Sequence, residues 1–478
     1  MSSAHSLSDK FIDLLNESVG EESANAYLNS FSDDPVVSIR INPRKWSVAD
    51  IDKIFPDIIK NPVPWSRYGF YLSERPSFTM DPLFHAGVYY VQEASSMYLE
   101  QCVEIFKRKY ISEGENTPFS DAPTLRILDL CAAPGGKSTH LLSLFSEDEA
   151  LFVLNEVIRS RVTILTENVA KWGYPNIVVT NNDASDFAAV QNYFDLIVAD
   201  VPCSGEGMFR KDKRAINEWS YDNVMLCAAR QKRIISDIWS SLKPGGYLIY
   251  STCTFNHFEN EDNIKWICEN LGAEVVPDCG RQFIPGLIEG EGFFCRMLIK
   301  KREELRSEQA LSGLTDNKKR RSGARRSGKI TGAITKYLKN GYSSAQSREL
   351  IKAYPENAEK EMLMLEKLLN SVHSAVAVGE LINSHNKEEQ FIPHADLALS
   401  TVLNQSSFHT EKLSYTEAIR FLSLEPLQFP DTPNGYILLT YKDIPLGFVK
   451  NLGNRTNNLL PKSRRILKRD DSCSYTTY

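Results

Sequence analysis

The sequence lacks the features that mark several classes of protein. No apolar run approaches the roughly 18 residues that a membrane-spanning helix needs, and residues 1–20 carry acidic side chains where a secretory signal would be basic and then apolar. The nine cysteines include no Cys-x-x-Cys pair and are odd in number, which argues against a disulfide framework and a zinc site. We therefore expect a cytoplasmic protein with reduced thiols, no membrane segment and no bound metal.

The chain also lacks an excess of positive charge. Its 478 residues carry a formal net charge of −6, whereas a protein that coats nucleic acids needs a broad positive surface. Any contact with RNA must therefore come from local patches. The length suits about three domains of ordinary globular composition.

The stretch from Thr124 to Leu142 (TLRILDLCAAPGGKSTHLL) has the pattern of a buried strand, a glycine turn and a helix. Such a turn lets backbone amides approach a ligand, and the helix N-terminus favours an anionic group. A P-loop would need a glycine five positions before Gly136, where Cys131 stands, and the Gly-x-Gly-x-x-Gly spacing of dinucleotide sites is absent here. A small ligand with a carboxylate and a ribose remains, and S-adenosylmethionine fits this description.

From Thr124 the sequence alternates strand and helix patterns over about 175 residues, which predicts a mostly parallel sheet with helices on both faces. The ligand crevice of such sheets lies beyond the carboxyl ends of the strands. Glu156 is placed to bind ribose hydroxyls and Asp183 the adenine amino group, although a lone acid after a strand is more often a helix cap or a turn residue. The polar groups at the predicted strand ends are Asn155 and Glu156 after 150–154, Asp183 after 176–180, Asp200 to Cys203 after 194–199, and Ser251 to Cys253 after 246–250.

Four segments resemble the motifs of one known family. They are DLCAAPGGKSTH at 129–140, NEVIRSR at 155–161, DVPCSGEGM at 200–208 and STCT at 251–254. Together they resemble RNA cytosine-5 methyltransferases of the NOL1/NOP2/Sun family over roughly residues 36–300. The overall length and C-terminal extension are most similar to the F-type bacterial members, which act on 16S ribosomal RNA. The resemblance implies an α/β fold with a Rossmann-like class I methyltransferase core.

The resemblance also implies roles for the residues at the strand ends. Carbon 5 of cytosine is a poor nucleophile, so a thiolate has to add at carbon 6 before carbon 5 can take a methyl group. By resemblance, Cys253 is this nucleophile, Cys203 assists product release, Asp200 hydrogen-bonds the cytosine edge at N3 or N4, and Lys137 lies in the same site. The residues expected to bind S-adenosylmethionine are Cys131, Ala132, Ala133, Pro134, Gly135, Gly136, Lys137, Glu156, Asp183 and Asp200.

Two local interpretations concern the surroundings of Cys253. A free thiol has a pKa near ~8.5, so this cysteine needs help to ionise at neutral pH. The segment from Asn256 to Glu259 (NHFE) has the form of a capping box and predicts a helix N-terminus directly after the cysteine. Cys295, in the following strand-like segment, is expected in the core and receives no functional role.

The patterns predict five segments along the chain. Besides the Rossmann-like core we expect an N-terminal α+β accessory domain and a C-terminal PUA-like RNA-binding region, the latter by resemblance to the F-type enzymes. The predicted segments are an N-terminal RNA-binding domain at 1–117, the methyltransferase domain at 118–303, a basic linker at 304–330, a small mostly helical domain at 331–388 and a PUA-like domain at 389–478.

These features predict an S-adenosylmethionine-dependent enzyme that methylates carbon 5 of a cytosine in 16S ribosomal RNA of the small ribosomal subunit, acting as a monomer. Two alternatives stay open, namely the same chemistry on transfer RNA and an RNA-binding assembly factor without turnover. DNA is disfavoured as the substrate, because the DNA enzymes take their nucleophile from a Pro-Cys motif and the Thr-Cys motif would then have no role.

Overall fold

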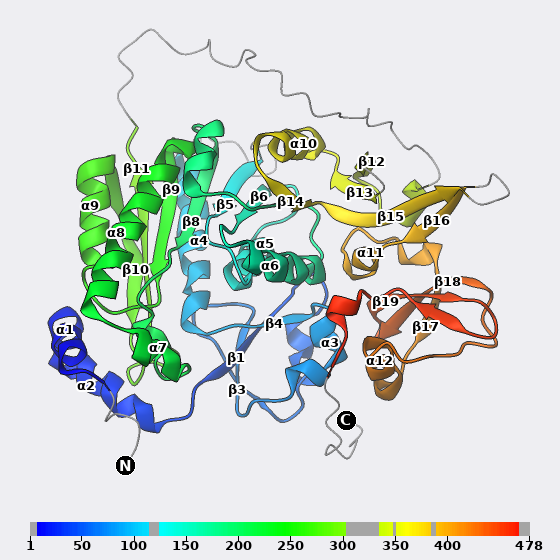
Figure 1. Cartoon of the computed structure of the whole chain (residues 1–478), viewed down its shortest axis with the longest axis horizontal. Coiled ribbons are helices and arrows are strands. Elements are labelled where there is room, and N and C mark those ends of the chain that lie inside the picture. The colour runs from blue at the N-terminus through cyan, green and yellow to red at the C-terminus, as the bar shows by residue number, and fades with distance from the viewer. Residues whose placement is uncertain (1–6, 114–123, 303–333, 348–349, 384–388, 468–478) are drawn as a thin grey trace, which may run out of the picture.

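The described part of the protein consists of four β-sheets and the helices packed on them (Figure 1). The computed structural model describes residues 7–113, 124–302, 334–347, 350–383 and 389–467. The predicted basic linker at 304–330 therefore lies outside the described residues. None of the helices in these ranges is long and apolar enough to cross a lipid bilayer.

The N-terminal part, blue in Figure 1, has the α+β character that the sequence predicts. Its sheet has the order β2-β3-β1-β4, and each of its neighbouring pairs is antiparallel. Side chains alternate across a strand, so Ile39 and Ile41 pack into one core while Arg40 between them is buried on the opposite face. The elements are α1 (Asp9–Val19), α2 (Glu21–Asn29), β1 (Val37–Ile41), β2 (Ile59–Pro62), β3 (Gly69–Leu72), α3 (Pro82–His85) and β4 (Tyr89–Val91).

The central sheet has eight strands in the order β10-β11-β9-β8-β5-β6-β7-β14. The run from β9 to β7 is parallel, whereas β10, β11 and β14 are antiparallel to their neighbours. This arrangement confirms the predicted Rossmann-like core. The strands are β5 (Leu125–Asp129), β6 (Ala150–Asn155), β7 (Ile177–Thr180), β8 (Phe194–Asp200), β9 (Leu242–Thr252), β10 (Ala273–Phe283), β11 (Phe293–Lys300) and β14 (Ser371–Ser374).

Helices cover both faces of the central sheet, which is why its inner strands are almost continuously apolar. Ile127 of β5 enters the core under the first layer and its neighbour Leu128 enters the core under the second. The first layer consists of α4 (Leu99–Glu113), α5 (Gly136–Leu144) and α6 (Arg159–Trp172); the second consists of α8 (Tyr221–Ile238), α9 (Glu261–Leu271) and α10 (Glu359–Leu368). The short α7 (Lys213–Glu218) precedes α8. Cys295 of β11 is fully buried, as expected of a core position.

The prediction of a mostly helical segment at 331–388 is wrong. Only α10 is a regular α-helix among its described residues, and a third sheet with the order β12-β13-β15-β16 takes most of the rest. The run HSAVAVGEL forms strands because its β-branched Val376 and Val378 are buried in a strand that is paired on both sides. The elements are β12 (Tyr342–Ser347), β13 (Leu350–Pro355), β15 (Val376–Asn383), β16 (Glu389–Pro393) and α11 (Ala395–Leu399).

The same segment also supplies the edge strand of the central sheet. β14 pairs antiparallel with β7, and main-chain hydrogen bonds of 3.0 Å run from Asn181 N to Asn370 O and from Ala375 N to Ile177 O. The predicted division at residues 303–331 therefore separates segments that share one sheet. The proposed domain boundaries themselves stay a prediction.

The C-terminal sheet packs against the N-terminal one (Figure 1). Its order is β17-β18-β19-β20, and Phe421 and Leu439 belong to the same apolar core as Ile39. The hydroxyl of Tyr415 donates to the carbonyl of Met80 at 3.1 Å across this junction. The elements are β17 (His409–Lys412), α12 (Tyr415–Leu422), β18 (Gly435–Tyr441), β19 (Ile444–Asn451) and β20 (Thr456–Asn458).

Ala375, directly after the edge strand, has a φ of 53° in the left-handed region and is buried. We expect Ala375→Pro to lower the free energy of unfolding by about 3 kcal/mol or more, because proline cannot adopt this φ and lacks the N–H that bonds Ile177. Ala375→Gly keeps that N–H and relieves the φ, so its expected change is at most about 1 kcal/mol. Urea denaturation followed by circular dichroism measures both, and equal stabilities would contradict the pairing of this strand with the sheet.

Candidate active site

The five parallel strands of the central sheet end along one edge, and the predicted site residues follow these ends. In spatial order the last residues of β7, β6, β5, β8 and β9 are Thr180, Asn155, Asp129, Asp200 and Thr252. The crevice beyond this edge is where an open α/β sheet binds its ligand. Among the described residues no group of three or more His, Cys, Asp or Glu side chains is arranged to hold a metal ion.

Two side chains of α6 hold the loop between β5 and α5 by hydrogen bonds to its carbonyl groups. Arg161 Nη2 donates to the carbonyl of Ala133 at 2.6 Å, and Asn168 Nδ2 donates to that of Pro134 at 2.8 Å. Gly135 then takes a φ of 112°, which favours glycine, and α5 begins with no side-chain cap on its first amides. Uncapped amides at a helix start can bind an anionic group such as a carboxylate.

Glu156 has the burial and the free acceptor expected of a ligand-binding acid. The residue is 2% exposed, and its Oε1 accepts from Ile158 N at 2.9 Å. In the described part of the chain Oε2 has no hydrogen-bond donor, although Arg161 Nη1 forms an ion pair with it at 3.3 Å. A buried carboxylate oxygen without a donor is costly, so a hydroxyl group is a fitting partner for it.

Asp183 has a structural role that explains its position. Its carboxylate caps the short helix η7 (Ala184–Ala189) by accepting from Ser185 N at 3.1 Å and from Ser185 Oγ at 2.9 Å. The backbone hydrogen bond from Ser185 is the main cause of a lowered pKa of this aspartate. A role for Asp183 in adenine binding stays a prediction. The thiol of Cys131 is half-buried, and burial raises its pKa, so it stays protonated at neutral pH.

The structure brings the four predicted catalytic side chains into two contacting pairs. Lys137 Nζ lies 2.7 Å from Asp200 Oδ2, and Ser251 Oγ donates to Asp200 Oδ1 at 2.8 Å. The sulfur atoms of Cys203 and Cys253 are 3.0 Å apart, and Cys253 N donates to the Cys203 sulfur at 3.3 Å. Residues from three segments far apart in the sequence thus form one cluster.

The electrostatics of this cluster distinguish its members. Burial opposes the charge of Lys137, but the adjacent Asp200 carboxylate, with smaller contributions from Asp129 and Cys253, outweighs burial and raises the pKa of the lysine. The contact with Cys253, followed by burial, raises the pKa of Cys203 well above its ordinary value. Cys203 therefore keeps its proton at neutral pH and can donate it to the sulfur of Cys253.

A buried acid that the sequence reasoning missed holds the loop of Cys253. Glu206 is 1% exposed, and its carboxylate accepts five hydrogen bonds from the described residues, of which four come from the segment directly after Cys253. The five donors are Thr254 Oγ1 (2.5 Å), Phe255 N (2.9 Å), Asn256 N (3.1 Å), Asn256 Nδ2 (3.0 Å) and Trp219 Nε1 (3.0 Å).

The contacts of a second buried acid, Glu259, show that the predicted capping box does not form as expected. Asn256 Oδ1 does accept from Glu259 N at 3.0 Å, but α9 begins only at Glu261, after Asn260. The carboxylate of Glu259 instead accepts from Ser204 N, Asn256 Nδ2 and Gln231 Nε2. It thus joins the two cysteine loops to α8, and no helix N-terminus directly follows Cys253.

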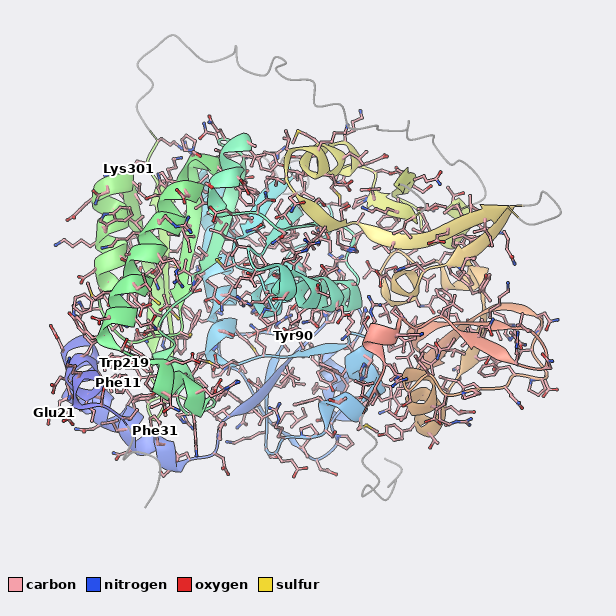
Figure 2. All side chains as sticks on the ribbon, in the orientation of Figure 1. Phe11, Glu21, Phe31, Tyr90, Trp219 and Lys301 are labelled. Atoms are coloured by element: carbon pink, nitrogen blue, oxygen red, sulfur yellow. The ribbon has the colours of Figure 1, made fainter. Side chains whose placement is uncertain are left out.

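The N-terminal helices support the same loops. Phe11 of α1 packs edge-on against Trp219 with ring centroids 5.4 Å apart, and Figure 2 shows the two labelled side chains next to each other. The hydroxyl of Tyr27 on α2 donates to the carbonyl of Glu206 at 2.8 Å. Gly207 N donates to the carbonyl of Cys253 at 2.8 Å, and a Cβ at Gly207 would lie 2.7 Å from Gly292 backbone atoms. The run Gly205-Glu206-Gly207 is the sequence feature that could have indicated this close approach of the two backbones.

Glu206→Gln should destabilise the protein, because a glutamine side chain has one acceptor oxygen and would turn its NH2 group towards buried donors. We expect the free energy of unfolding to fall by about 2 to 3 kcal/mol, measured by urea denaturation. The exposed Glu218 of α7 offers a matched control, and Glu218→Gln is expected to stay within about 0.5 kcal/mol of the wild type. Equal stability of the two variants would contradict the role assigned to the Glu206 carboxylate.

Asp129 gives the stability a distinct dependence on pH. The residue is 1% exposed, Ser138 Oγ donates to its Oδ2 at 2.6 Å, and Oδ1 has no donor in the described ranges. Burial, with a smaller contribution from Asp200, raises its pKa to about 7, above the value near ~3.9 of an unfolded chain. Its proton therefore stabilises the fold at low pH, and this stability is lost as the pH rises through about 7.

Asp129→Asn removes the titrating group and isolates this effect. We expect the melting temperature of the wild type to fall relative to that of Asp129→Asn between about pH 5 and about pH 8, because only the wild type has to lose a proton from a buried carboxyl. Differential scanning calorimetry at a series of pH values measures the difference. A difference that does not change with pH would show that the Asp129 carboxyl has an ordinary pKa.

Comparison with known proteins gives consistent matches along the chain. Models for three protein families match: 16S rRNA methyltransferase RsmB/F at residues 120–298, the N-terminal domain of 16S rRNA methyltransferase RsmF at residues 7–94, and the methyltransferase RsmF PUA domain at residues 408–466. Ribosomal RNA small subunit methyltransferase F of Shigella boydii serotype 18 is 30% identical over 458 residues, which cover 89% of each chain. The protein of the same name from Escherichia coli O81 is 29% identical over the same length and coverage.

Solved structures agree in fold. The methyltransferase homolog protein from Pyrococcus horikoshii aligns with a TM-score of 0.51 and 28% identity, covering 61% of this chain and 95% of its own. NSun6 from Pyrococcus horikoshii aligns with a TM-score of 0.51 and 18% identity, covering 63% of this chain and 100% of its own, and shows the fold alone. With the relative that is 30% identical over 89% of both chains, these matches show that the chain belongs to the family of RsmF-type 16S rRNA methyltransferases.

Proposed function

We propose that the protein transfers a methyl group from S-adenosylmethionine to carbon 5 of a cytosine in 16S ribosomal RNA, through a covalent bond between Cys253 and carbon 6 of the base. The observation that carries the proposal is the pair of thiols 3.0 Å apart, beside the Lys137 and Asp200 ion pair. Simple binding of RNA needs no such pair. Cytosine chemistry at carbon 5 needs one sulfur that adds and a proton carrier close to it.

The residues at the strand ends fit S-adenosylmethionine. The uncapped amides at the start of α5 suit a carboxylate, and the buried Oε2 of Glu156 suits a ribose hydroxyl. The cofactor supplies an electrophilic methyl group when it is bound. The residues proposed to hold it are Cys131, Ala132, Ala133, Pro134, Gly135, Gly136, Lys137, Glu156, Asp183 and Asp200.

The two thiols take different parts in this chemistry. The raised pKa of Cys203 suits it to the role of proton carrier, and we assign the role of nucleophile to Cys253, whose sulfur lies 3.0 Å away. Attack of the Cys253 sulfur on carbon 6 moves electron density to carbon 5, which then bonds the methyl group. Transfer of the proton from carbon 5 to a water molecule reforms the double bond between carbons 5 and 6 and breaks the bond from carbon 6 to sulfur, so that Cys253 leaves as a thiolate. Cys203 is close enough to assist this release.

Asp200 and Lys137 orient the base and balance the charge. Lys137 occupies Oδ2 of Asp200 and Ser251 occupies Oδ1, yet each carboxylate oxygen keeps a lone pair for a further donor. The amino group of cytosine at N4 is such a donor.

Small-subunit ribosomal RNA is the substrate that the relatives favour. The curated relatives carry the name ribosomal RNA small subunit methyltransferase F and align with 89% of this chain, and the RsmF PUA-domain model matches residues 408–466. A base within folded RNA has to be turned out of its stack before a thiol can reach carbon 6. We therefore expect the C-terminal and N-terminal sheets to hold the RNA around the target nucleotide, and a single chain in the cytoplasm to suffice.

Transfer of labelled methyl groups to small subunits, naked 16S ribosomal RNA and transfer RNA tests the proposal. We expect label on the small-subunit RNA with wild-type protein, a loss of at least about 1,000-fold with Cys253→Ala because no sulfur can add to the base, and accumulation of a protein–RNA adduct with Cys203→Ala. Digestion of the RNA to nucleosides identifies 5-methylcytosine.

Cys268→Ala, at a half-exposed thiol of α9 far from the strand ends, is the matched control and should keep wild-type activity. Activity that survives Cys253→Ala would show that the nucleophile is a different residue. Label on transfer RNA alone would show that transfer RNA, and not 16S ribosomal RNA, is the substrate. Binding of subunits without any label would favour a non-catalytic assembly factor.

A further inference from the structure

Arg40 of β1 reaches out of the N-terminal sheet into the helix that follows the cofactor loop. It is 0% exposed, and its guanidinium donates to four acceptors on α5. Nη2 contacts the carbonyl of Gly136 at 3.2 Å and Oγ1 of Thr139 at 2.6 Å, while Nη1 contacts the carbonyl of Thr139 at 3.2 Å and Oγ of Ser143 at 3.1 Å. The remaining Nε donates to Gln92 Oε1 at 2.8 Å.

The buried charge of Arg40 is unusual because no carboxylate in the described part of the chain forms an ion pair with it. Burial lowers the pKa of Arg40 to about 9, so the side chain still carries its charge at neutral pH. The face of Trp172, 4.7 Å from the guanidinium carbon, provides a cation–π contact. A buried cation whose partners are mainly carbonyl and hydroxyl groups costs free energy, and a neutral apolar residue would fill the site at lower cost.

The hydrogen bonds of Arg40 continue into the cofactor loop. Thr139 Oγ1, which accepts from Arg40, donates in turn to the carbonyl of Gly135 at 2.7 Å. Gly135 is the residue in the left-handed region at the turn before α5. Arg40 therefore fixes the orientation of the Thr139 hydroxyl, and through it the carbonyl that ends the loop.

The opposite side of the same turn is held by the central sheet. Ser138 Oγ donates to the buried Asp129 at 2.6 Å, so residues 135–139 are held both by β5 and by the N-terminal sheet. Lys137 lies between these two attachments and directs its ammonium to Asp200 at 2.7 Å. Tyr90, labelled in Figure 2, is on β4 of the N-terminal sheet, and a Cβ at Gly136 would lie 3.4 Å from its ring. The start of α5 is therefore closely fitted to the N-terminal sheet.

We propose that Arg40 is a positioning residue for methyl transfer, which sets the cofactor loop and Lys137 through its fork of hydrogen bonds to Gly136 and Thr139. The N-terminal domain is then a part of the cofactor site and not only an RNA-binding accessory. This inference rests on the proposed use of S-adenosylmethionine at the strand ends.

A second arginine of the N-terminal part provides a matched control. Arg44, directly after β1, also reaches α5, but at its far end, where Nη2 donates to the carbonyl of Phe145 at 3.0 Å and Nη1 pairs with Glu147. Its guanidinium lies 4.0 Å from the ring of Tyr174, as that of Arg40 lies over Trp172. Arg40 and Arg44 thus join the same two parts of the protein, and only Arg40 contacts the turn that precedes Lys137.

The test is the affinity of the full chain for S-adenosylhomocysteine, measured by titration calorimetry without RNA for Arg40→Met, Arg40→Lys, Thr139→Val and Arg44→Met. We expect Arg40→Met to raise the Kd by tenfold or more, since the loss of hydrogen bonds to a charged group releases the turn. Arg40→Lys should lie between the wild type and Arg40→Met, because an ammonium cannot reproduce the fork. Thr139→Val, which keeps the shape and removes the hydroxyl relay, should raise the Kd severalfold.

Arg44→Met should leave the Kd within twofold of the wild type even where its melting temperature falls as far as that of Arg40→Met. In the methyl-transfer assay, Arg40→Lys should raise the KM for S-adenosylmethionine and leave the KM for 16S ribosomal RNA unchanged. If Arg40→Met does not fold, Arg40→Lys and Thr139→Val carry the test. Unchanged Kd values for both would overturn the inference, whereas a wild-type protein that binds no S-adenosylhomocysteine would overturn the proposed function instead.

Discussion

The parallel pairing of β8 with β9 is the interaction on which the site depends. Its register places Asp200 opposite Ser251, so the loops that carry Cys203 and Cys253 leave the sheet side by side. A slip of one residue would turn the last side chains of one strand to the other face of the sheet. The contact between Ser251 and Asp200, and the 3.0 Å approach of the two sulfur atoms, would then be lost. The arrangement on which the proposed chemistry depends is therefore set by main-chain hydrogen bonds in the core.

Beyond the strand ends the loops need support of another kind, and two buried acids provide it. Isolated buried carboxylates are costly, yet both acids are well supplied with hydrogen-bond donors. Glu206, in the Cys203 loop, accepts from the Cys253 loop and from Trp219. Glu259 accepts from both cysteine loops and from Gln231 of α8. Hydrogen bonds specify directions, whereas apolar packing of the same volume would not. We infer that these acids serve to give the loops one conformation, in which the Cys203 thiol can donate to Cys253.

The sequence predicts those parts of the structure that depend on local patterns. The alternation of strands and helices, and the rule that ligands bind beyond strand ends, were enough to place Asp200, Cys203 and Cys253 together, and the family resemblance added Lys137. Contacts between residues that are distant in the sequence leave no local pattern. For this reason the sequence did not predict the edge strand at 371–374 or the role of Glu206. The capping box failed for the same reason, because the Asn256 backbone N–H bonds Glu206 and the Glu259 carboxylate bonds Ser204 and Gln231, which the tertiary fold brings in.

The N-terminal and C-terminal parts of the chain are packed against each other and joined to the central sheet, and are not loosely attached to it. The N-terminal and C-terminal sheets share one apolar core, and β14 ties the segment between linker and C-terminal sheet to β7 through the main chain. The N-terminal part in turn contacts the start of α5 through Arg40. Through Tyr27 it contacts Glu206 in the Cys203 loop and the ring of Phe255 in the Cys253 loop. RNA held by these sheets would therefore meet the thiols at a distance set by packed cores. The proposed reaction needs a fixed distance of this kind, because a base turned out of a folded RNA has to place its carbon 6 within reach of the Cys253 sulfur.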